Sequence, residues 1–344
     1  MPKVDVFQTN DCILIVFITL ISIITRIWLI SSPDSITFDE VYFGNFTNYY
    51  INRTYFHDIH PPLAKLIMFT FAYVSGYKGQ INFGNNCSLP YLHDDINYIS
   101  LRLTPAIIQS FCFPLIYAAM RYFSFSSFTS FSTSFALIFE PTLLVEGRFI
   151  LSDGILHFFS CLNIFAISIY IIDYESNYLW FAALSLGCAI SCKHTAFGLI
   201  AFDGFSQLIW IYKYRPSIKE IIERAIKFLL PAFSIFFLTN LIHFLILIYK
   251  GPGNDYFPSQ ISKSFLNLGS YGGLQLLGRS IYYRMYHLVI NTLFGHMMEY
   301  PVHPYESRPE YWPFLMSKYI VFASFPQRNV ILIGSPLTYW PATF

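Results

Sequence analysis

Three clusters of polar residues interrupt an otherwise apolar chain of 344 residues, and each contains side chains that can take part in catalysis. The first holds the adjacent acids Asp39 and Glu40, followed closely by the segment DIHPPLAK at residues 58–65. Adjacent carboxylates beside a membrane surface can act as a general base that removes the proton of a hydroxyl group. Asp39 and Glu40 are therefore the candidate catalytic residues, with the solvated side chains of an ordinary loop as the alternative interpretation.

The second cluster, EGRFILSD at residues 146–153, and the third, HPYESRP at residues 303–309, add cations at the same membrane boundary. A single arginine at such a position can simply extend to lipid headgroups. Several cations near an acidic pair instead indicate a site for an anionic, lipid-linked substrate, because guanidinium groups form paired hydrogen bonds with phosphate. The candidate substrate-binding residues are Arg26, His60, Arg102, Arg148, Asp153, Lys193, His303 and Arg308.

The composition indicates that the elements positioning these clusters lie in a membrane. Hydrophobic residues make up 55% of the chain and charged residues only 12%, about half the charged share of soluble domains. So few charges cannot cover the surface of a soluble protein of this size, and the same figures exclude a disordered chain. The net charge of +1 gives no support to a nucleic-acid partner. The six cysteines lack ligand spacing and the histidines are scattered, so we expect no metal site.

Seven segments are candidates for transmembrane helices, which need roughly 20 mostly apolar residues. They lie at 12–31, 103–120, 123–139, 154–172, 178–192, 194–212 and 228–249. The basic cluster at 213–227 indicates a cytosolic loop by the positive-inside rule, which also places the N-terminus in the cytosol. The segments 32–102, 140–153 and 250–344 then lie together on the opposite side, with the short apolar piece 66–74 along the membrane surface.

Several motifs resemble those of the protein O-mannosyltransferases, the dolichyl-phosphate-mannose–protein mannosyltransferases. The similar stretches are TFDEVYFGNF, YFHDIHPPLAKL, LRLTPA, EGRFILSDG, SCKHTAFG, HPYESRPEYWP and ILIGSPLTYW, in the family's order over residues 12–344. The resemblance implies an all-α integral membrane protein of the GT-C type, multi-pass in the endoplasmic reticulum membrane, whose lumenal loops carry the active site.

The resemblance also implies an activity and its partners. Mannose would move, with inversion, from dolichyl phosphate mannose to Ser or Thr hydroxyls of secretory-pathway proteins. No cofactor is implied beyond this polyprenyl-phosphate sugar donor, and the implied partners are the acceptor proteins, membrane lipid and another family member in a dimer. Carried over by position, Asp39 resembles the family's catalytic acid residue, and Glu40 would orient it or bind the sugar or peptide. The family's other lumenal motifs are matched at Arg26, Arg102, Arg148, His303 and Arg308.

The chain departs from the family's pattern in its organisation. We expect a transmembrane catalytic core at 1–249, with the first lumenal loop at 32–102, and a lumenal C-terminal segment at 250–344 that carries HPYESRP. The loop from Gly251 to His303 is too short for the MIR domain of most eukaryotic members, and the sequence ends before their further spans. These features predict a short form of the family. Gly147 and Ser335 replace the family's usual residues.

Three other functions remain open on the sequence. One is a catalytically silent subunit that partners an active relative, and another is a GT-C enzyme with a glycan acceptor. The third is a transporter, for which Asp203 in the sixth predicted span is the main support, because acids within membranes are functional candidates. For Asp203 itself we favour a hydrogen bond to a neighbouring helix.

Overall fold

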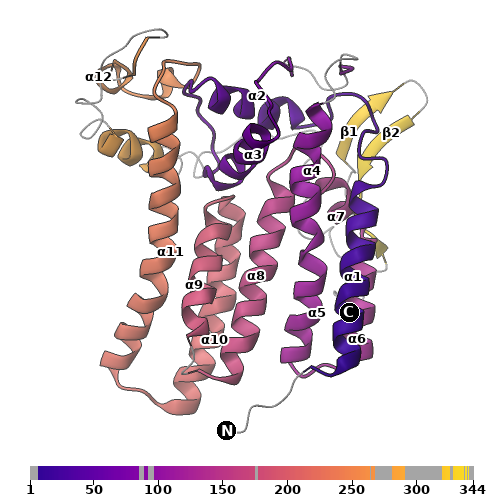
Figure 1. Cartoon of the computed structure of the whole chain (residues 1–344). Helices are drawn as coiled ribbons and strands as arrows, with labels where there is room; N and C mark the ends of the chain where they lie inside the picture. The colour runs from indigo at the N-terminus through magenta and orange to yellow at the C-terminus, as the bar shows by residue number, and fades with distance from the viewer. Residues whose placement is uncertain are drawn as a thin grey trace.

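The computed structural model describes residues 7–84, 89–91, 97–174, 177–263, 265–267, 281–290, 320–325, 328–336, 338 and 340. Long helices in this part of the chain run side by side as one bundle (Figure 1). They are α1 (Thr9–Ile27), α4 (Asn97–Ser110), α5 (Cys112–Tyr122), α6 (Ser127–Ile138), α8 (Asp153–Ile172), α9 (Tyr178–Ile190), α10 (Gly198–Tyr214) and α11 (Ile218–Ile246). The shorter elements are α2 (Glu40–Ile51), α3 (Leu63–Val74), α7 (Pro141–Glu146), η1 (His194–Phe197), η2 (Asn254–Tyr256) and α12 (Ser259–Ser262).

The predicted helical membrane fold is confirmed, although not every predicted span is a full-length helix. Among the described residues, 5 helical stretches are long and apolar enough to cross a membrane: Thr9–Ile27, Asn97–Tyr122, Asp153–Ile172, His194–Tyr214 and Ile218–Ile246. The predicted spans 123–139 and 178–192 correspond to α6 and α9, of 12 and 13 residues. At 1.5 Å per residue each is roughly 20 Å long, shorter than the hydrocarbon core of about 30 Å.

The second span shows how the bundle satisfies backbone groups that a proline leaves free. Pro114 has no N–H to donate, so the carbonyl of Ser110 loses its helical partner and the helix breaks between α4 and α5. The hydroxyl of Ser22 in α1 donates to this carbonyl at 2.8 Å. The carbonyl freed by the break therefore links α4 to α1.

The acid predicted inside a span has a structural partner. Asn163 of α8 donates through Nδ2 to Oδ2 of Asp203 in α10 at 3.1 Å, and both side chains are fully buried. The predicted hydrogen bond to a neighbouring helix is confirmed. Asp203 therefore joins α8 to α10.

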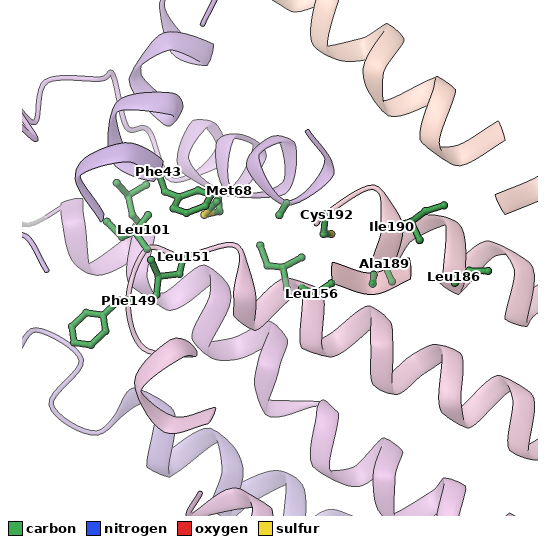
Figure 2. Close-up of a cluster of buried hydrophobic side chains, with 14 of the residues drawn as sticks. Phe43, Met68, Leu101, Phe149, Leu151, Leu156, Leu186, Ala189, Ile190 and Cys192 are labelled. Carbon is green, nitrogen blue, oxygen red and sulfur yellow. The ribbon is translucent and has the colours of Figure 1, made fainter. Parts of the chain in front are cut away.

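Helices α2 and α3 cover one end of the bundle, which we call the α2–α3 end (Figure 1). Beneath them lies a continuous apolar core, in which Phe43 of α2 and Met68 of α3 pack against side chains of the bundle (Figure 2). The bundle contributes Leu101, Leu151, Leu156, Leu186, Ala189 and Ile190. The segment 66–74, predicted along the membrane surface, forms most of α3 and lies at this end of the bundle.

A β-hairpin departs from the all-α prediction. Strands β1 (Ile320–Phe325) and β2 (Arg328–Leu332) pair in antiparallel fashion. The backbone N–H of Phe38 donates to the carbonyl of Phe322 at 2.9 Å, and the two rings stack with centroids 4.1 Å apart. The C-terminal part of the chain thus contacts the residue that precedes Asp39.

Helices α9 and α11 approach each other closely at a glycine. A Cβ atom added to Gly187 in α9 would lie 2.7 Å from the carbonyl oxygen and 2.9 Å from the Cα of Ala232 in α11. A Cβ atom added to Gly204 in α10 would meet nothing within 4 Å. Backbone cannot move aside as a flexible side chain can, so only the first glycine is required by packing.

We predict that Gly187→Ala lowers stability by about 1–3 kcal/mol, the usual cost of overpacking. The control Gly204→Ala should be neutral or stabilising by up to about 1 kcal/mol, because alanine favours a helix more than glycine does. Apparent unfolding temperatures of the purified variants in one detergent test this. Equal temperatures for the two variants would contradict the close packing of α9 on α11.

Candidate active site

A buried ion pair fixes the entrance to α2. Arg102 of α4 donates through Nε to Oε1 of Glu40 at 2.7 Å and through a second nitrogen to Oε2 at 2.8 Å. Both side chains are fully buried. Such a pair is stable only where the remaining hydrogen-bonding capacity of both groups is satisfied.

Three further groups donate hydrogen bonds to the carboxylate of Glu40. The backbone N–H of Thr37 donates at 2.8 Å, the hydroxyl of Tyr91 at 3.1 Å and the backbone N–H of Ile150 at 3.1 Å. The guanidinium group of Arg102 uses its other hydrogens on the carbonyls of Ile30, Pro33 and Ser35. This network joins the end of α1, the start of α2, α4 and the segment before α8. Both Glu40 and Arg102 are therefore placed to position the site rather than to contact a substrate.

Asp39 has a contrasting environment. It is the N-cap residue of α2, is only partly buried, and its carboxylate accepts no hydrogen bond from any described residue. Burial, together with the carboxylates of Asp153 and Asp58, raises the pKa of Asp39 to about 6, although Lys193 opposes this shift. An unpartnered carboxylate with this pKa is mostly ionised near neutral pH and remains basic enough to accept a proton.

The backbone before Asp39 is strained. Phe38 has a φ of 49°, in the left-handed region that bulky residues rarely adopt. Its stacking on Phe322 and its backbone hydrogen bond to the same residue hold it there. The β-hairpin therefore contributes to the position of Asp39.

Two ion pairs lie within electrostatic range of Asp39. Lys193 lies 2.9 Å from Asp153, and both side chains are partly exposed. Lys65 pairs with Asp58 and also donates to the carbonyl of His60 at 2.7 Å. Burial alone would raise the pKa of Asp58, but the ammonium group of Lys65 outweighs it and the pKa lies below its ordinary value. The structure thus brings together side chains from four separate segments of the chain.

His60 is neutral and has an unused ring nitrogen. Burial is the main cause that lowers its pKa to about 4, and the cations Lys65 and Lys193 act in the same direction. Its Nδ1 atom is buried and has no hydrogen-bond partner among the described residues. A neutral imidazole with a free nitrogen can accept or donate one hydrogen bond to a bound molecule.

An apolar cavity of about 170 Å³ opens beside His60 and Asp58. Its other walls are mainly aromatic and come from η1 and α11, including Phe197, Phe233 and Phe237. The lining is thus mostly apolar, with the polar side chains of Asp58, His60, His194 and Asn240 among it. This lining suits an amphipathic ligand, because the apolar chain of such a ligand avoids water while its polar group meets His60.

A second titratable cluster lies between α7 and α8. Burial, with the carboxylate of Asp153, raises the pKa of Glu146 to about 8, and its Oε2 lies 3.5 Å from Nε2 of His157. The Nδ1 atom of His157 is 3.1 Å from the amide nitrogen of Gln109. A Cβ atom on Gly147 would lie 1.8 Å from Oε1 of Gln109, so only glycine permits this arrangement.

Of the remaining predicted site residues, two are described by the structure and two are not. Arg26 is fully buried and donates to Oε1 of Gln109 and to the carbonyl of Ile138. Arg148 donates to the carbonyls of Thr25, Trp28 and Leu29 and so caps the end of α1, although it also lines a cavity of about 550 Å³. His303 and Arg308 lie outside the described residues, and their substrate-binding role stays a prediction.

Sequence reasoning assigned no role to several residues of this site. Lys65 and Asp58 stood in a quoted motif, and Pro61-Pro62 before Leu63 signals a helix start that places Lys65 in the first turn, facing back to the loop. Gln109, His157 and Phe322 gave no such signal. Their roles depend on contacts between distant segments.

The comparison with known families agrees with this arrangement. The sequence model of the family described as "Dolichyl-phosphate-mannose-protein mannosyltransferase" matches residues 16–249, which include Asp39, Glu40, Asp153 and Lys193. The chain belongs to this family. The resemblance found in the motifs is thereby confirmed.

Curated members of the mannosyltransferase family are longer than this chain. Dolichyl-phosphate-mannose–protein mannosyltransferase 3 of Saccharomyces cerevisiae is 28% identical over 274 residues, which cover 75% of this chain and 36% of that protein. Mannosyltransferase 4 of Schizosaccharomyces pombe is 29% identical over 312 residues, which cover 85% of this chain and 39% of that protein. The chain thus spans somewhat more than a third of these relatives.

A solved structure of the family has the same fold. The Saccharomyces cerevisiae protein O-mannosyltransferase Pmt1-Pmt2 complex bound to the sugar donor matches 76% of this chain and 37% of the matched chain. The TM-score is 0.68 at 24% sequence identity. This similarity confirms the expected GT-C type fold.

The contrast between the two acids predicts unequal effects of their substitution on stability. Glu40→Gln leaves Arg102 without its counter-charge in a buried site, a change that typically costs about 3–5 kcal/mol. Asp39→Asn removes no hydrogen bond and should change stability by no more than about 0.5 kcal/mol. Unfolding temperatures of the two purified variants test this difference.

A milder variant is needed if Glu40→Gln cannot be produced as folded protein. Tyr91→Phe removes one hydrogen bond to Glu40, which should cost about 0.5–1.5 kcal/mol. Equal unfolding temperatures for Asp39→Asn and Tyr91→Phe would contradict the assignment of Glu40 as the structural member of the pair.

Proposed function

We propose that this chain transfers mannose from dolichyl phosphate mannose to Ser or Thr hydroxyls of proteins. The observation that carries the proposal is that the carboxylate of Asp39 is partly buried and has no hydrogen-bond partner among the described residues. In the neighbouring Glu40, by contrast, both carboxylate oxygens accept hydrogen bonds. Membership of the mannosyltransferase family supplies the donor and acceptor classes. The resemblance assigns the same residue as the catalytic one.

The proposed reaction is a single displacement at the anomeric carbon of the mannose. Asp39 takes the proton of the acceptor hydroxyl, the hydroxyl oxygen bonds to the anomeric carbon, and the bond from that carbon to the phosphate oxygen breaks. The electron pair leaves with dolichyl phosphate, a good leaving group that needs no strong general acid. Such a reaction needs no metal or other cofactor.

The cations and the apolar cavity of the site support a proposed position for the donor. Lys193 is a cation within electrostatic range of Asp39, neutral His60 offers a hydrogen bond, and by the family resemblance Arg308 and His303 would be added to them. A phosphate withdrawn from water requires such cations or hydrogen bonds. The cavity between η1 and α11 would take the first part of the polyprenyl chain, which remains in lipid beyond it.

The proposal includes a location and a partner. The α2–α3 end would face the lumen of the endoplasmic reticulum, and the N-terminus and the basic loop at 213–227 would face the cytosol. The solved structure with the same fold is a complex of two mannosyltransferases, which supports a dimer between this chain and another family member.

A silent partner subunit is the second candidate function. The solved structure with the same fold is a complex of two mannosyltransferases, which favours a role for this chain as one subunit beside an active family member. Transfer that depends on Asp39 of this chain separates the two functions, because a silent subunit has no use for a general base.

We predict that Asp39→Asn lowers transfer by a factor on the order of 10²–10⁴, the usual contribution of a general base. Purified protein, alone and with a family partner, is given radiolabelled dolichyl phosphate mannose and a Ser/Thr-rich peptide. The donor should still bind the variant, because asparagine keeps the shape of the side chain. Transfer by the dimer that does not change with Asp39→Asn would favour the silent subunit.

The pKa of Asp39 predicts the acid limb of the pH–rate profile. Protonated Asp39 cannot accept a proton, so the rate should fall as the pH decreases through about 6. Asp153→Asn should move this limb to lower pH, because the carboxylate of Asp153 raises the pKa of Asp39. Without that carboxylate, the charge of Lys193 lowers the pKa of Asp39 more effectively. A limb that stays in place in Asp153→Asn would exclude Asp39 as the titrating group.

A further inference from the structure

A polar cavity of about 250 Å³ lies at the end of the bundle opposite to the α2–α3 end. Helices α8 and α10 end there, and α9 and α11 begin there (Figure 1). A single water needs only roughly 10–15 Å³ of such space. The cavity can therefore hold a group considerably larger than water.

Two buried donors form part of its wall. Tyr174 and Trp210 line the cavity, and each side chain is only 5% exposed. The hydroxyl of Tyr174 and the Nε1 atom of Trp210 have no hydrogen-bond partner among the described residues. A buried N–H or O–H group without a partner is costly. Because the indole nitrogen can only donate, the missing partner is an acceptor.

An arginine holds these two residues in place. The guanidinium carbon of Arg224 lies 3.7 Å from the centre of the Trp210 ring, and a guanidinium nitrogen donates to the carbonyl of Tyr174 at 3.0 Å. Lys227 follows one helical turn later and lines the same cavity. A group with negative charge would thus meet two cations and two N–H or O–H donors.

The cavity also contains acids. Glu220 and Glu223 line it from the first turns of α11, on the same helix as Arg224 and Lys227. Two carboxylates therefore accompany the two cations. A ligand that is only an anion would be repelled by the acids, whereas a ligand with one phosphate and one amine has a partner for each charge.

We propose that this cavity binds the headgroup of a zwitterionic phospholipid from the adjacent leaflet. The phosphate accepts hydrogen bonds from Tyr174 and Trp210 and lies near Lys227, and the amine lies near Glu220 and Glu223. The half-exposed ring of Trp180 at the rim is typical of the membrane–water boundary, where a headgroup lies. This site is separate from mannosyl transfer and does not depend on it.

Native mass spectrometry of the full chain, purified and stripped of lipid, tests the proposal. The protein is offered equal amounts of phosphatidylcholine and phosphatidylglycerol with the same acyl chains. The parent chain should retain phosphatidylcholine preferentially. The double variant Tyr174→Phe, Trp210→Phe should retain roughly tenfold less, because hydrogen bonds to a charged phosphate are stronger than neutral ones. Tyr178→Phe, an exposed tyrosine at the start of α9, is the matched control.

Three results would overturn the proposal. The first is equal retention by the double variant and by Tyr178→Phe, and the second is no preference for phosphatidylcholine over phosphatidylglycerol. The third is binding of soluble glycerophosphocholine as tightly as the lipid, which would identify a site for a soluble phosphodiester instead. Glu223→Lys provides a test that leaves the buried wall intact. It should shift the preference from phosphatidylcholine to phosphatidylglycerol, and an unchanged preference would contradict the assignment of the acids.

Discussion

The bidentate pair between Glu40 and Arg102 is the interaction on which the geometry of the α2–α3 end depends. Two charges removed from water are stable only if their attraction and their hydrogen bonds replace the lost solvation. Here both oxygens of Glu40 are met by five hydrogen bonds, and Arg102 also binds three backbone carbonyls. Because these donors and acceptors come from the segment 30–40 and from Tyr91, Arg102 and Ile150 farther along the chain, the pair fixes the first loop, α4 and the segment before α8 in one arrangement.

Two adjacent acids thereby acquire different properties. Glu40 is buried and fixed by hydrogen bonds, whereas Asp39 is left without a partner at the edge of the same network. Environments that separate two neighbouring carboxyl groups in this way are typical of acid–base assignments in enzymes. The strain at Phe38 belongs to the same arrangement, since its left-handed backbone is held by contacts with β1. Position, rather than residue type, decides which acid is available to a substrate.

The two ends of the bundle illustrate two uses of polar residues in an apolar protein. At the α2–α3 end the charges pair with one another around Asp39, and inside the bundle Asn163 and Asp203 join two helices. At the opposite end the donors of Tyr174 and Trp210 remain without a partner from the described chain. Paired groups stabilise the fold, whereas unpaired buried groups next to a cavity indicate a ligand.

The sequence alone determined the membrane character, most of the helices, the family and the acidic pair, because hydropathy, charge content and short motifs are local properties. It could not distinguish Asp39 from Glu40 physically, since their environments depend on Arg102, Tyr91 and Ile150, which are far apart in the chain. It also began the helix at 123–139 too early, because hydropathy does not show that Ser126 is the N-cap residue at which α6 starts. The β-hairpin and the assignment of Arg26, Arg102 and Arg148 to backbone carbonyls were decided only by the tertiary structure. A buried arginine binds whichever acceptors the fold brings to it, and no local pattern specifies those acceptors.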